Sequence, residues 1–161
     1  MNKVIYPGTF DPVTYGHIDV IKRATELFDF VAVTVAVNPG KKPLFSTKER
    51  VDMLKESLKD FDNVSVDSFN GLVVDHAKAV GATGIIRGLR AVSDFEYEFQ
   101  LALMNRRLNR EVQTVFLMTG LRWIFTSSSI IKEAAQFGGD IETMVPPIVN
   151  QKLKEKFGSH S

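Results

Sequence analysis

The sequence predicts an α/β fold with one five-stranded parallel sheet and helices on both of its faces. Five short apolar stretches rich in Val and Ile are typical of strands, and segments with helical spacing alternate with them. Strands that alternate with helices form parallel sheets through right-handed crossovers. No linker, internal repeat or low-complexity segment interrupts this alternation, so residues 1–161 are expected to form a single domain.

The limits of the expected elements follow from apolar runs, turn residues and helix caps. The expected strands cover residues 3–6, 30–37, 64–69, a segment beginning at 85, and 114–118. The expected helices cover residues 17–28, 47–61, 72–80, 94–108, 128–137 and 146–157. Phe95, Phe99 and Leu103 form one apolar stripe of the fourth helix. Residues 158–161 are expected to form a frayed tail.

Composition excludes several classes of function. The formal net charge is +1, which indicates no general attraction to nucleic acid. The chain contains no cysteine, which excludes disulfides, thiol nucleophiles and cysteine-ligated metals and suits a reducing compartment. The first residues lead at once into a strand, and no apolar run approaches the ~20 residues that span a bilayer. We therefore expect no signal peptide, no membrane segment and a cytoplasmic location.

The segment after the first expected strand is suited to bind phosphate. Residues 4–6 lead into a turn, and a helix follows with His17 at its N-terminus. The free N–H groups and the dipole of a helix start favour an anion. Gly8 and Gly16 allow the backbone to approach a ligand closely, while Thr9 and His17 add side-chain donors. The same pattern also fits an ordinary turn in which the imidazole only begins a helix.

Cationic and hydroxylic residues follow the other expected strands. Lys41 and Lys42 follow the second strand, Arg87 and Arg90 the fourth, and residues 127–129, all serine, the fifth. Because the carboxyl ends of parallel strands meet at one edge, we expect these groups to converge on a ligand with several phosphates. Simpler interpretations are a solvated lysine pair, surface arginines and a serine N-cap. The P-loop and dinucleotide-binding glycine patterns are absent, as is metal-ligand spacing.

The motif Thr14-Tyr15-Gly16-His17 resembles the T/H-x-G-H signature of the nucleotidyltransferase superfamily. Residues 6–17, 41–45, 86–98 and 127–133 resemble the phosphopantetheine adenylyltransferase family over nearly the whole chain. The resemblance implies a Rossmann-like, doubly wound bacterial enzyme of coenzyme A biosynthesis. Such an enzyme transfers the adenylyl group of ATP reversibly to 4′-phosphopantetheine and releases pyrophosphate. It also implies Mg²⁺ with ATP and a cytoplasmic homohexamer, while feedback binding of coenzyme A is left open.

The resemblance also implies roles for individual residues. His17 is expected to stabilise the transition state. The positions expected to bind the acceptor are Thr9, Lys41, Val73 and Arg87. The positions expected to contact ATP are Thr9, Phe10, His17, Gly88, Leu89, Arg90, Glu98, Trp123, Ile124, Phe125, Thr126, Ser127, Ser128 and Ser129. Ile124 and Thr126 depart from the family pattern, which usually has a small residue and an aliphatic there. No protein residue is expected to hold a metal, so Mg²⁺ would arrive with ATP.

Two other functions stay open at this point. One is a sister nucleotidyltransferase that acts on another phosphorylated acceptor, such as nicotinamide mononucleotide or a pantothenate-like molecule. The other is a flavodoxin-like module that binds nucleotide without chemistry. Convergence of Lys41, Arg87 and Arg90 with His17 favours chemistry over binding alone.

Overall fold

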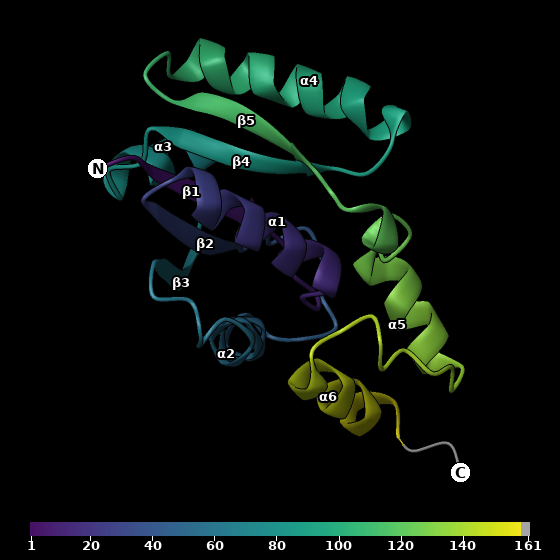
Figure 1. Cartoon of the computed structure of the whole chain (residues 1–161). Coiled ribbons are helices and arrows are strands. Elements are labelled where there is room, and N and C mark those ends of the chain that lie inside the picture. Colours follow the sequence, from purple (N-terminus) through teal and green to yellow (C-terminus); the bar gives the residue numbers. More distant parts are fainter. Residues whose placement is uncertain (159–161) are drawn as a thin grey trace.

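The computed structural model describes residues 1–158, with the side chains of residues 92 and 93 left out (Figure 1). It is an α/β fold in which five strands form one parallel sheet of order β3-β2-β1-β4-β5. The strands are β1 (Lys3–Gly8), β2 (Phe30–Ala36), β3 (Val64–Phe69), β4 (Gly84–Leu89) and β5 (Gln113–Met118). The helices are α1 (Tyr15–Leu27), α2 (Thr47–Ser57), α3 (Val73–Ala79), α4 (Val92–Leu108), the 3₁₀ turn η1 (Leu121–Trp123), α5 (Ser128–Gln136) and α6 (Pro147–Phe157). The predicted fold class is confirmed.

The chain reverses its direction of winding between β1 and β4, at the centre of the sheet. From β1 it proceeds outward to β2 and β3, and then crosses over to β4 and β5. β1 pairs with β4 only through Val4 with Gly84 and Ile5 with Ile85. Beyond Ile5 the two strands no longer pair, so a crevice opens at their carboxyl ends. This switch point is where open parallel sheets bind ligands.

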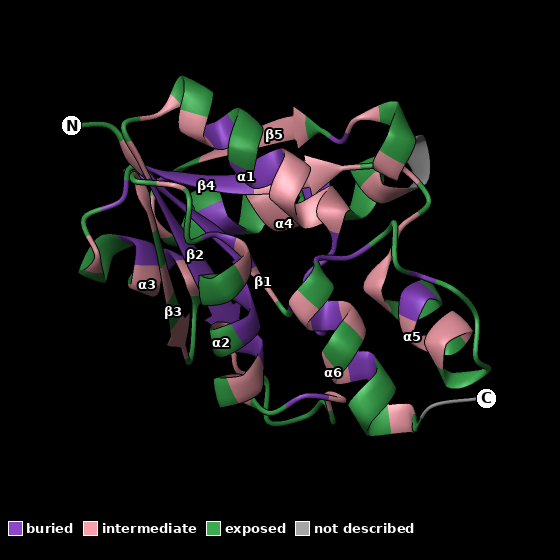
Figure 2. Ribbon diagram, turned by 60° about the horizontal axis from the view of Figure 1, so that its bottom comes forward, coloured by how far each residue is buried: buried purple, intermediate pink, exposed green. Residues whose placement is uncertain are grey.

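Successive side chains of each strand point to opposite faces of the sheet and pack into two separate cores. Helices therefore cover both faces of the sheet. Val4 and Tyr6 pack into the larger core with residues of α1, α2, α5 and α6. Ile5 points the other way, into a smaller core with residues of α3. Helix α4 contacts α3, β4 and β5, so it covers the same face as α3 near the outer strand (Figures 1 and 2).

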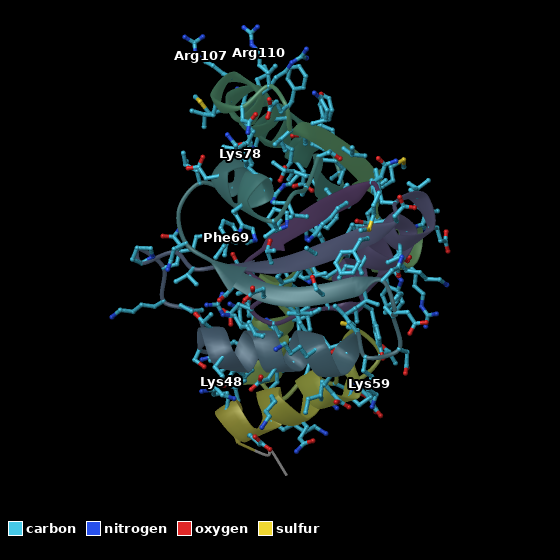
Figure 3. The ribbon with its side chains drawn as sticks, turned by 90° about the vertical axis from the view of Figure 1, so that its left-hand side faces the viewer. Lys48, Lys59, Phe69, Lys78, Arg107 and Arg110 are labelled. Atoms are coloured by element: carbon cyan, nitrogen blue, oxygen red, sulfur yellow. The ribbon has the colours of Figure 1, made fainter. Side chains whose placement is uncertain are left out.

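Helix α4 has the opposite burial pattern to an ordinary surface helix. Its buried side chains are polar, Glu98 and Asn105. Its large apolar side chains are between half and two-thirds exposed, namely Phe95, Tyr97, Phe99, Leu103, Met104 and Leu108. The predicted helix is confirmed, but its apolar stripe does not pack into the core of this chain. Arg107, in the last turn of the same helix, and Arg110, just beyond its end, project away from the body of the molecule (Figure 3).

Several predicted helix limits were wrong by a few residues. Helix α1 begins at Tyr15 because Thr14 caps it. Helix α2 ends at Ser57, short of the predicted residue 61, although Ser46 caps its start as the sequence indicates. The predicted frayed tail begins at Gly158, which is exposed, and its residues 159–161 lie outside the described residues. Within residues 1–158 no helix is both long and apolar enough to cross a bilayer. The cytoplasmic location stays a prediction.

Candidate active site

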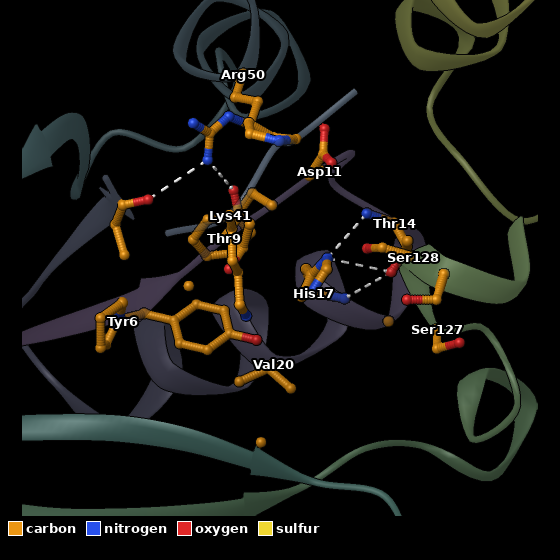
Figure 4. A pocket seen from close by; sticks show the side chains of 18 of the residues that line it. Tyr6, Thr9, Asp11, Thr14, His17, Val20, Lys41, Arg50, Ser127 and Ser128 are labelled. Atoms are coloured by element: carbon orange, nitrogen blue, oxygen red, sulfur yellow. Dashed lines mark hydrogen bonds between the residues drawn. The ribbon is translucent and has the colours of Figure 1, made fainter. Parts of the chain in front are cut away.

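A cavity of about 790 Å³ lies at the carboxyl edge of the sheet, beyond the point where β1 and β4 separate. Its walls come from the turn after β1, the loop after β2, the end of β4 and the segment that leads into α5 (Figure 4). The predicted site residues that line it are Thr9, Phe10, His17, Lys41, Arg87, Gly88, Arg90, Glu98, Trp123, Thr126, Ser127, Ser128 and Ser129. The strand pattern predicted that one part of this set would meet at one edge of the sheet, and the structure brings it there, while contacts with ligands stay predictions. This part is Thr9, His17, Lys41, Arg87, Arg90 and residues 127–129, together with Lys42. The volume suits a ligand of cofactor size.

The turn after β1 forms the floor of the cavity and holds a strained residue. Phe10 has a φ of 49°, in the left-handed region that bulky side chains rarely adopt. Its buried ring packs edge-on against Tyr6 and His17, with centroids 5.4 and 4.9 Å apart. Gly8 is needed beneath this ring, because a Cβ there would lie 3.0 Å from the Phe10 ring atoms. Strain of this kind is found at functional sites, where surrounding contacts maintain it.

His17 is held by a capping box in which histidine takes the place of the usual Glu or Gln. Thr14 is the N-cap of α1, and its side-chain oxygen accepts a hydrogen bond from the His17 N–H over 3.3 Å. In return, the Thr14 N–H donates to Nδ1 of His17 over 3.0 Å (Figure 4). A backbone N–H can only donate, so Nδ1 carries no proton. The proton of the neutral ring therefore lies on Nε2.

The surroundings of His17 keep its imidazole neutral. Burial, with a smaller contribution from the positive charge of Arg90, lowers the pKa of His17 from 6.5 to about 4. Burial raises the pKa of the Tyr6 hydroxyl, so this group also stays protonated at neutral pH. At pH 7 the cavity floor thus presents an uncharged Nε2–H donor beside cationic side chains.

Arg50 fixes the turn after β1 from below. It is only 3% exposed, although it is charged. Its guanidinium donates to the carbonyl oxygen of Thr9 over 2.9 Å, and more weakly to that of Ala36 over 3.4 Å (Figure 4). It also donates to Thr47 Oγ1 over 3.2 Å, within its own helix. Arg50 thereby couples the predicted ligand residue Thr9 to the end of β2 and the start of α2.

Arg87 is oriented by a fork of two hydrogen bonds. Its Nε and Nη2 donate to the two carboxylate oxygens of Glu98, each over 2.7 Å. Nη1 donates to the carbonyl oxygen of Pro7 over 3.4 Å. Glu98 is buried, and both of its oxygens are occupied by Arg87. This bidentate geometry fixes the plane of the guanidinium at the end of β4, and it excludes the interpretation of Arg87 as an unattached surface arginine.

The three serines have different tasks. Ser127 is the N-cap of α5, and its side chain accepts from the Ile130 N–H over 3.2 Å. Ser128 donates from its hydroxyl to the carbonyl oxygen of Pro12 over 2.7 Å, which ties α5 to the turn after β1. Ser129 lines the cavity with them. One serine suffices as a cap, so the sequence of three serves more than capping.

The segment before the serines closes over the start of α1. Thr126 donates from Oγ1 to the carbonyl oxygen of Trp123 over 2.7 Å. A Cβ at Gly16 would lie 3.1 Å from Thr126 Oγ1, so glycine permits this close approach. The Trp123 ring packs against Tyr15, with centroids 5.3 Å apart. Thr126, which departs from the family pattern, is thus used to shape the loop.

Four predicted site residues do not line the cavity. Val73 packs against the smaller core on the far face of the sheet, because it begins α3. Phe125 is 85% exposed and points into solvent. Leu89 and Ile124 are also missing from the cavity wall. The resemblance alone suggested these four residues, and their contacts with ligands stay predictions.

Sequence reasoning missed other residues of the wall. Asp11 stands before Pro12, a local pattern typical of a turn, yet it is buried and makes three hydrogen bonds with distant residues. Arg50 lies inside a helix without any motif, and Lys132 carried no signal beyond its place one turn after the serines. Thr14 was noted only as part of a motif. Outside the wall, His76 of α3 stacks on Phe69 with ring centroids 4.6 Å apart.

Comparison with known proteins assigns this site to a family. Residues 5–134 match the cytidylyltransferase-like family. The chain is 68% identical over 158 residues to the phosphopantetheine adenylyltransferase of Desulfosudis oleivorans, covering 98% of this chain and 94% of that protein. It is 59% identical over 157 residues to the one from Caldanaerobacter subterraneus, covering 98% of each. The chain belongs to the phosphopantetheine adenylyltransferase family. The resemblance noted in the sequence is confirmed.

A solved structure shows the same fold outside this family. A protein assigned as a nicotinate-nucleotide adenylyltransferase from Vibrio parahaemolyticus superposes with a TM-score of 0.71. The match covers 95% of this chain and 99% of that one, at 18% identity. At this identity the likeness concerns the fold alone.

The cavity wall of this phosphopantetheine adenylyltransferase family member, as the structure describes it, offers no free carboxylate to Mg²⁺. Magnesium prefers oxygen ligands such as carboxylates. The carboxylates of the cavity wall, Asp11 and Glu98, are occupied by cationic and N–H donors. Among the described residues, no group of three His, Cys, Asp or Glu side chains could hold a metal. The wall is built for anions.

Proposed function

We propose that the chain catalyses the reversible transfer of the adenylyl group of ATP to 4′-phosphopantetheine, which yields dephospho-coenzyme A and pyrophosphate. Membership of the phosphopantetheine adenylyltransferase family supports this reaction. The observation that carries the chemistry is the neutral imidazole of His17, whose Nδ1 is occupied by Thr14 and whose Nε2–H is left for a ligand. We treat residues 1–161 as one catalytic domain.

The reaction needs little from the protein in the way of proton transfer. A phosphate oxygen of the acceptor is a nucleophile at neutral pH, and it attacks the α-phosphorus of ATP in line with the leaving group. A new P–O bond forms, and the bond between the α-phosphorus and the bridging oxygen breaks, so that pyrophosphate leaves with the electron pair. Positioning of the reactants and stabilisation of charge on the α-phosphate then account for catalysis.

His17 is the residue we assign to the α-phosphate. Its Nε2–H donates to a non-bridging oxygen as negative charge develops there. Being neutral, the ring does not bind the ground-state phosphate as an ion pair would, so its hydrogen bond can strengthen in the transition state. The N-terminus of α1 lies beside it, and the helix dipole favours the same negative charge.

The acceptor and the nucleotide are assigned to opposite sides of His17. Lys41, Arg87 and Thr9 are proposed to hold the phosphate of 4′-phosphopantetheine. Arg90 and the serines at the start of α5 are proposed to hold the β- and γ-phosphates of ATP. The other predicted nucleotide contacts, Phe10, Gly88, Leu89, Glu98 and residues 123–126, are retained for the remainder of ATP.

Magnesium enters this proposal only as part of the substrate. The oxygens of the triphosphate can carry the ion, which needs no ligand from the protein in that case. We assign no step of the reaction to it.

We also infer that the chain assembles into a homo-oligomer, for which the family resemblance implies a hexamer. The support is the burial pattern of helix α4, because half-exposed Phe99 and Leu103 lie on a helix whose polar Glu98 and Asn105 are buried. A large exposed apolar face is typical of a surface that another protein covers. Coenzyme A contains the 4′-phosphopantetheine arm, so we infer that it competes for the acceptor side of the cavity.

A pyrophosphate-release assay with a panel of acceptors tests the proposed reaction. The purified chain with ATP and Mg²⁺ is expected to release pyrophosphate with 4′-phosphopantetheine and not with nicotinamide mononucleotide or pantothenate. Release with nicotinamide mononucleotide alone would assign the chain to a sister reaction. Release with none of the acceptors, together with measurable ATP binding, would identify a nucleotide-binding module instead.

A further inference from the structure

Asp11 is a buried carboxylate with three partners from two distant parts of the chain. It is 4% exposed. Its Oδ1 accepts from the Phe45 N–H over 2.9 Å, and its Oδ2 accepts from the Leu44 N–H over 2.8 Å. The same Oδ2 forms an ion pair with Nζ of Lys132 over 2.9 Å. A carboxylate with several donors is fixed in position more firmly than a surface charge.

These three contacts join the two halves of the cavity. Leu44 and Phe45 belong to the loop after β2, which carries Lys41 on the side assigned to the acceptor. Lys132 belongs to α5, whose first turn carries the serines on the side assigned to ATP. Asp11 itself lies in the turn between them, directly after the strained Phe10.

Other tethers fix the same turn but do not span the cavity in this way. Arg50 holds the Thr9 carbonyl from the β2 side, and Ser128 holds the Pro12 carbonyl from the α5 side. Each of them reaches only one wall. Within residues 1–158, the Asp11 carboxylate is the group whose hydrogen bonds connect the loop after β2 with helix α5.

We propose that Asp11, through its ion pair with Lys132, is a positioning residue that sets the separation between the acceptor-binding loop and the nucleotide-binding start of α5. This inference rests on the proposed function. In-line transfer depends on the distance between the attacking oxygen and the α-phosphorus, and these two atoms belong to molecules held by opposite walls. A misplacement of about 1 Å can lower a rate by about 10²-fold even when each molecule still binds.

The expected signature is a loss of kcat without a matching loss of binding. Asp11→Asn keeps the size of the side chain but removes the charge that pairs with Lys132, and it is expected to lower kcat by roughly 10- to 100-fold. The KM values for ATP and for 4′-phosphopantetheine are each expected to change by less than about threefold. The chain contains a single tryptophan, Trp123, which lines the cavity, so its fluorescence reports the Kd for ATP without turnover.

Variants of Lys132 test the pairing itself. Lys132→Met leaves the buried carboxylate without its cation and is expected to lower kcat about as much as Asp11→Asn. Lys132→Arg keeps the charge and is expected to retain kcat within about threefold. The double variant Asp11→Asn with Lys132→Met is expected to have a kcat no lower than that of the slower single variant. The reason is that both changes break the same ion pair.

A matched control uses an ion pair of the same chemistry outside the cavity. Lys48 and Asp52 form an exposed i,i+4 pair on α2, with Lys48 on the outer side of that helix (Figure 3). Lys48→Met with Asp52→Asn is expected to leave kcat unchanged, because exposed pairs contribute little. This control shows whether a loss of kcat depends on where the ion pair lies or only on the removal of one positive and one negative charge.

Several results would overturn the inference. One is a kcat of Asp11→Asn equal to that of the wild type. Another is a kcat of the double variant that falls by the product of the two single losses. A third is a Kd for ATP that Lys132→Met raises more than tenfold at unchanged kcat, which would make Lys132 a direct ligand. If Asp11→Asn does not fold, equal rates for Lys132→Met and Lys132→Arg would overturn it as well. An inactive wild-type chain would refute the proposed function instead, whereas an active wild type with an indifferent Asp11→Asn refutes this inference alone.

Discussion

The main-chain N–H of Thr14 and Nδ1 of His17 are joined by a hydrogen bond of 3.0 Å, and this bond decides which nitrogen of the imidazole meets the ligand. A side chain on the first turn of a helix would otherwise be free to present either nitrogen. Here the donor faces Nδ1, so the ring can be neutral only with its proton on Nε2. The local capping geometry thereby prepares the donor before any substrate binds.

Removal of that donor should affect turnover more than binding. His17→Ala is expected to lower kcat by roughly 10²- to 10³-fold, the scale of one lost oxyanion donor, with small changes in KM. His17→Asn places an acceptor oxygen near the position of Nδ1 but nothing at Nε2, so it should keep the helix cap and still lose activity. His17→Gln should recover part of kcat, because its amide N–H₂ reaches toward the Nε2 position. Near-normal turnover in His17→Ala, measured by pyrophosphate release, would remove His17 from the mechanism.

The low pKa of His17 predicts a specific dependence of stability on pH. The unfolded chain takes up a proton on this histidine below pH 6.5, whereas the folded chain does so only near pH 4. The contribution of the neutral ring is therefore complete above pH 6.5 and is lost as the pH falls from 6.5 through about 4. The free energy of unfolding of the wild type should fall more steeply across this window than that of His17→Asn. The free energy of unfolding of each protein is measured by denaturant titration at several pH values. An equal dependence on pH in the two proteins would contradict the prediction, as would an imidazole of His17 that titrates near pH 6.5 by NMR.

The fork between Arg87 and Glu98 should be visible in acceptor binding. Glu98→Gln leaves the guanidinium with one charged partner fewer and releases its orientation, so the KM for 4′-phosphopantetheine is expected to rise roughly tenfold. Arg87→Lys should raise it at least as much, because an ammonium group cannot form the fork. Glu56→Gln breaks the exposed pair between Glu56, at the end of α2, and Lys59, which follows that helix, and it serves as the control. An unchanged acceptor KM in Glu98→Gln would show that the fork only stabilises the fold.

The fold was predictable because each element carries its own local signal. Alternation of β-branched strands with capped helices identifies a parallel sheet, and the topology then places all the strand ends at one edge. Thus His17, Lys41 and Arg87 could be placed together without any knowledge of their contacts. The topology says nothing of Val73 and Phe125, which the family resemblance alone suggested, because the direction of a side chain near a helix or turn depends on the exact limits of that element.

The roles of Asp11 and Arg50 were not predictable from local patterns. The partners of Asp11 lie 33, 34 and 121 residues away in the sequence, and no local sequence pattern indicates them. Helix α4 shows a related difficulty. Periodicity correctly indicated an apolar stripe with Phe99 and Leu103, but it does not distinguish a stripe that faces the core from one that faces another subunit.

The exposed stripe of α4 predicts that assembly depends on it. Leu103→Glu adds a charge to the centre of this face and should dissociate the oligomer, since an unpaired charge is costly in an apolar interface. Leu27, an isolated exposed leucine at the end of α1, offers the control Leu27→Glu, which should leave the assembly intact. Sedimentation velocity measures both. A wild-type monomer, or a hexamer that tolerates Leu103→Glu, would refute α4 as the interface.

Gly88 links the end of β4 to the position of His17 through the packing of α1. A Cβ at Gly88 would lie 3.0 Å from Cγ2 of Val20, which is buried one turn after His17 on the same helix. Gly88→Ala should therefore displace α1, with a loss of roughly 1–3 kcal/mol in the free energy of unfolding. It should also lower kcat at least about tenfold, because the Nε2–H moves with the helix.

The double variant decides whether this loss comes from crowding. Val20→Ala removes the methyl group that meets the new Cβ, so Gly88→Ala with Val20→Ala should turn over faster than Gly88→Ala alone. The comparison is clean because the same alanine at residue 88 is present in both proteins. If Gly88 acts instead by letting its main chain touch the nucleotide, Val20→Ala will restore nothing, and the KM for ATP will rise in the single and double variants alike.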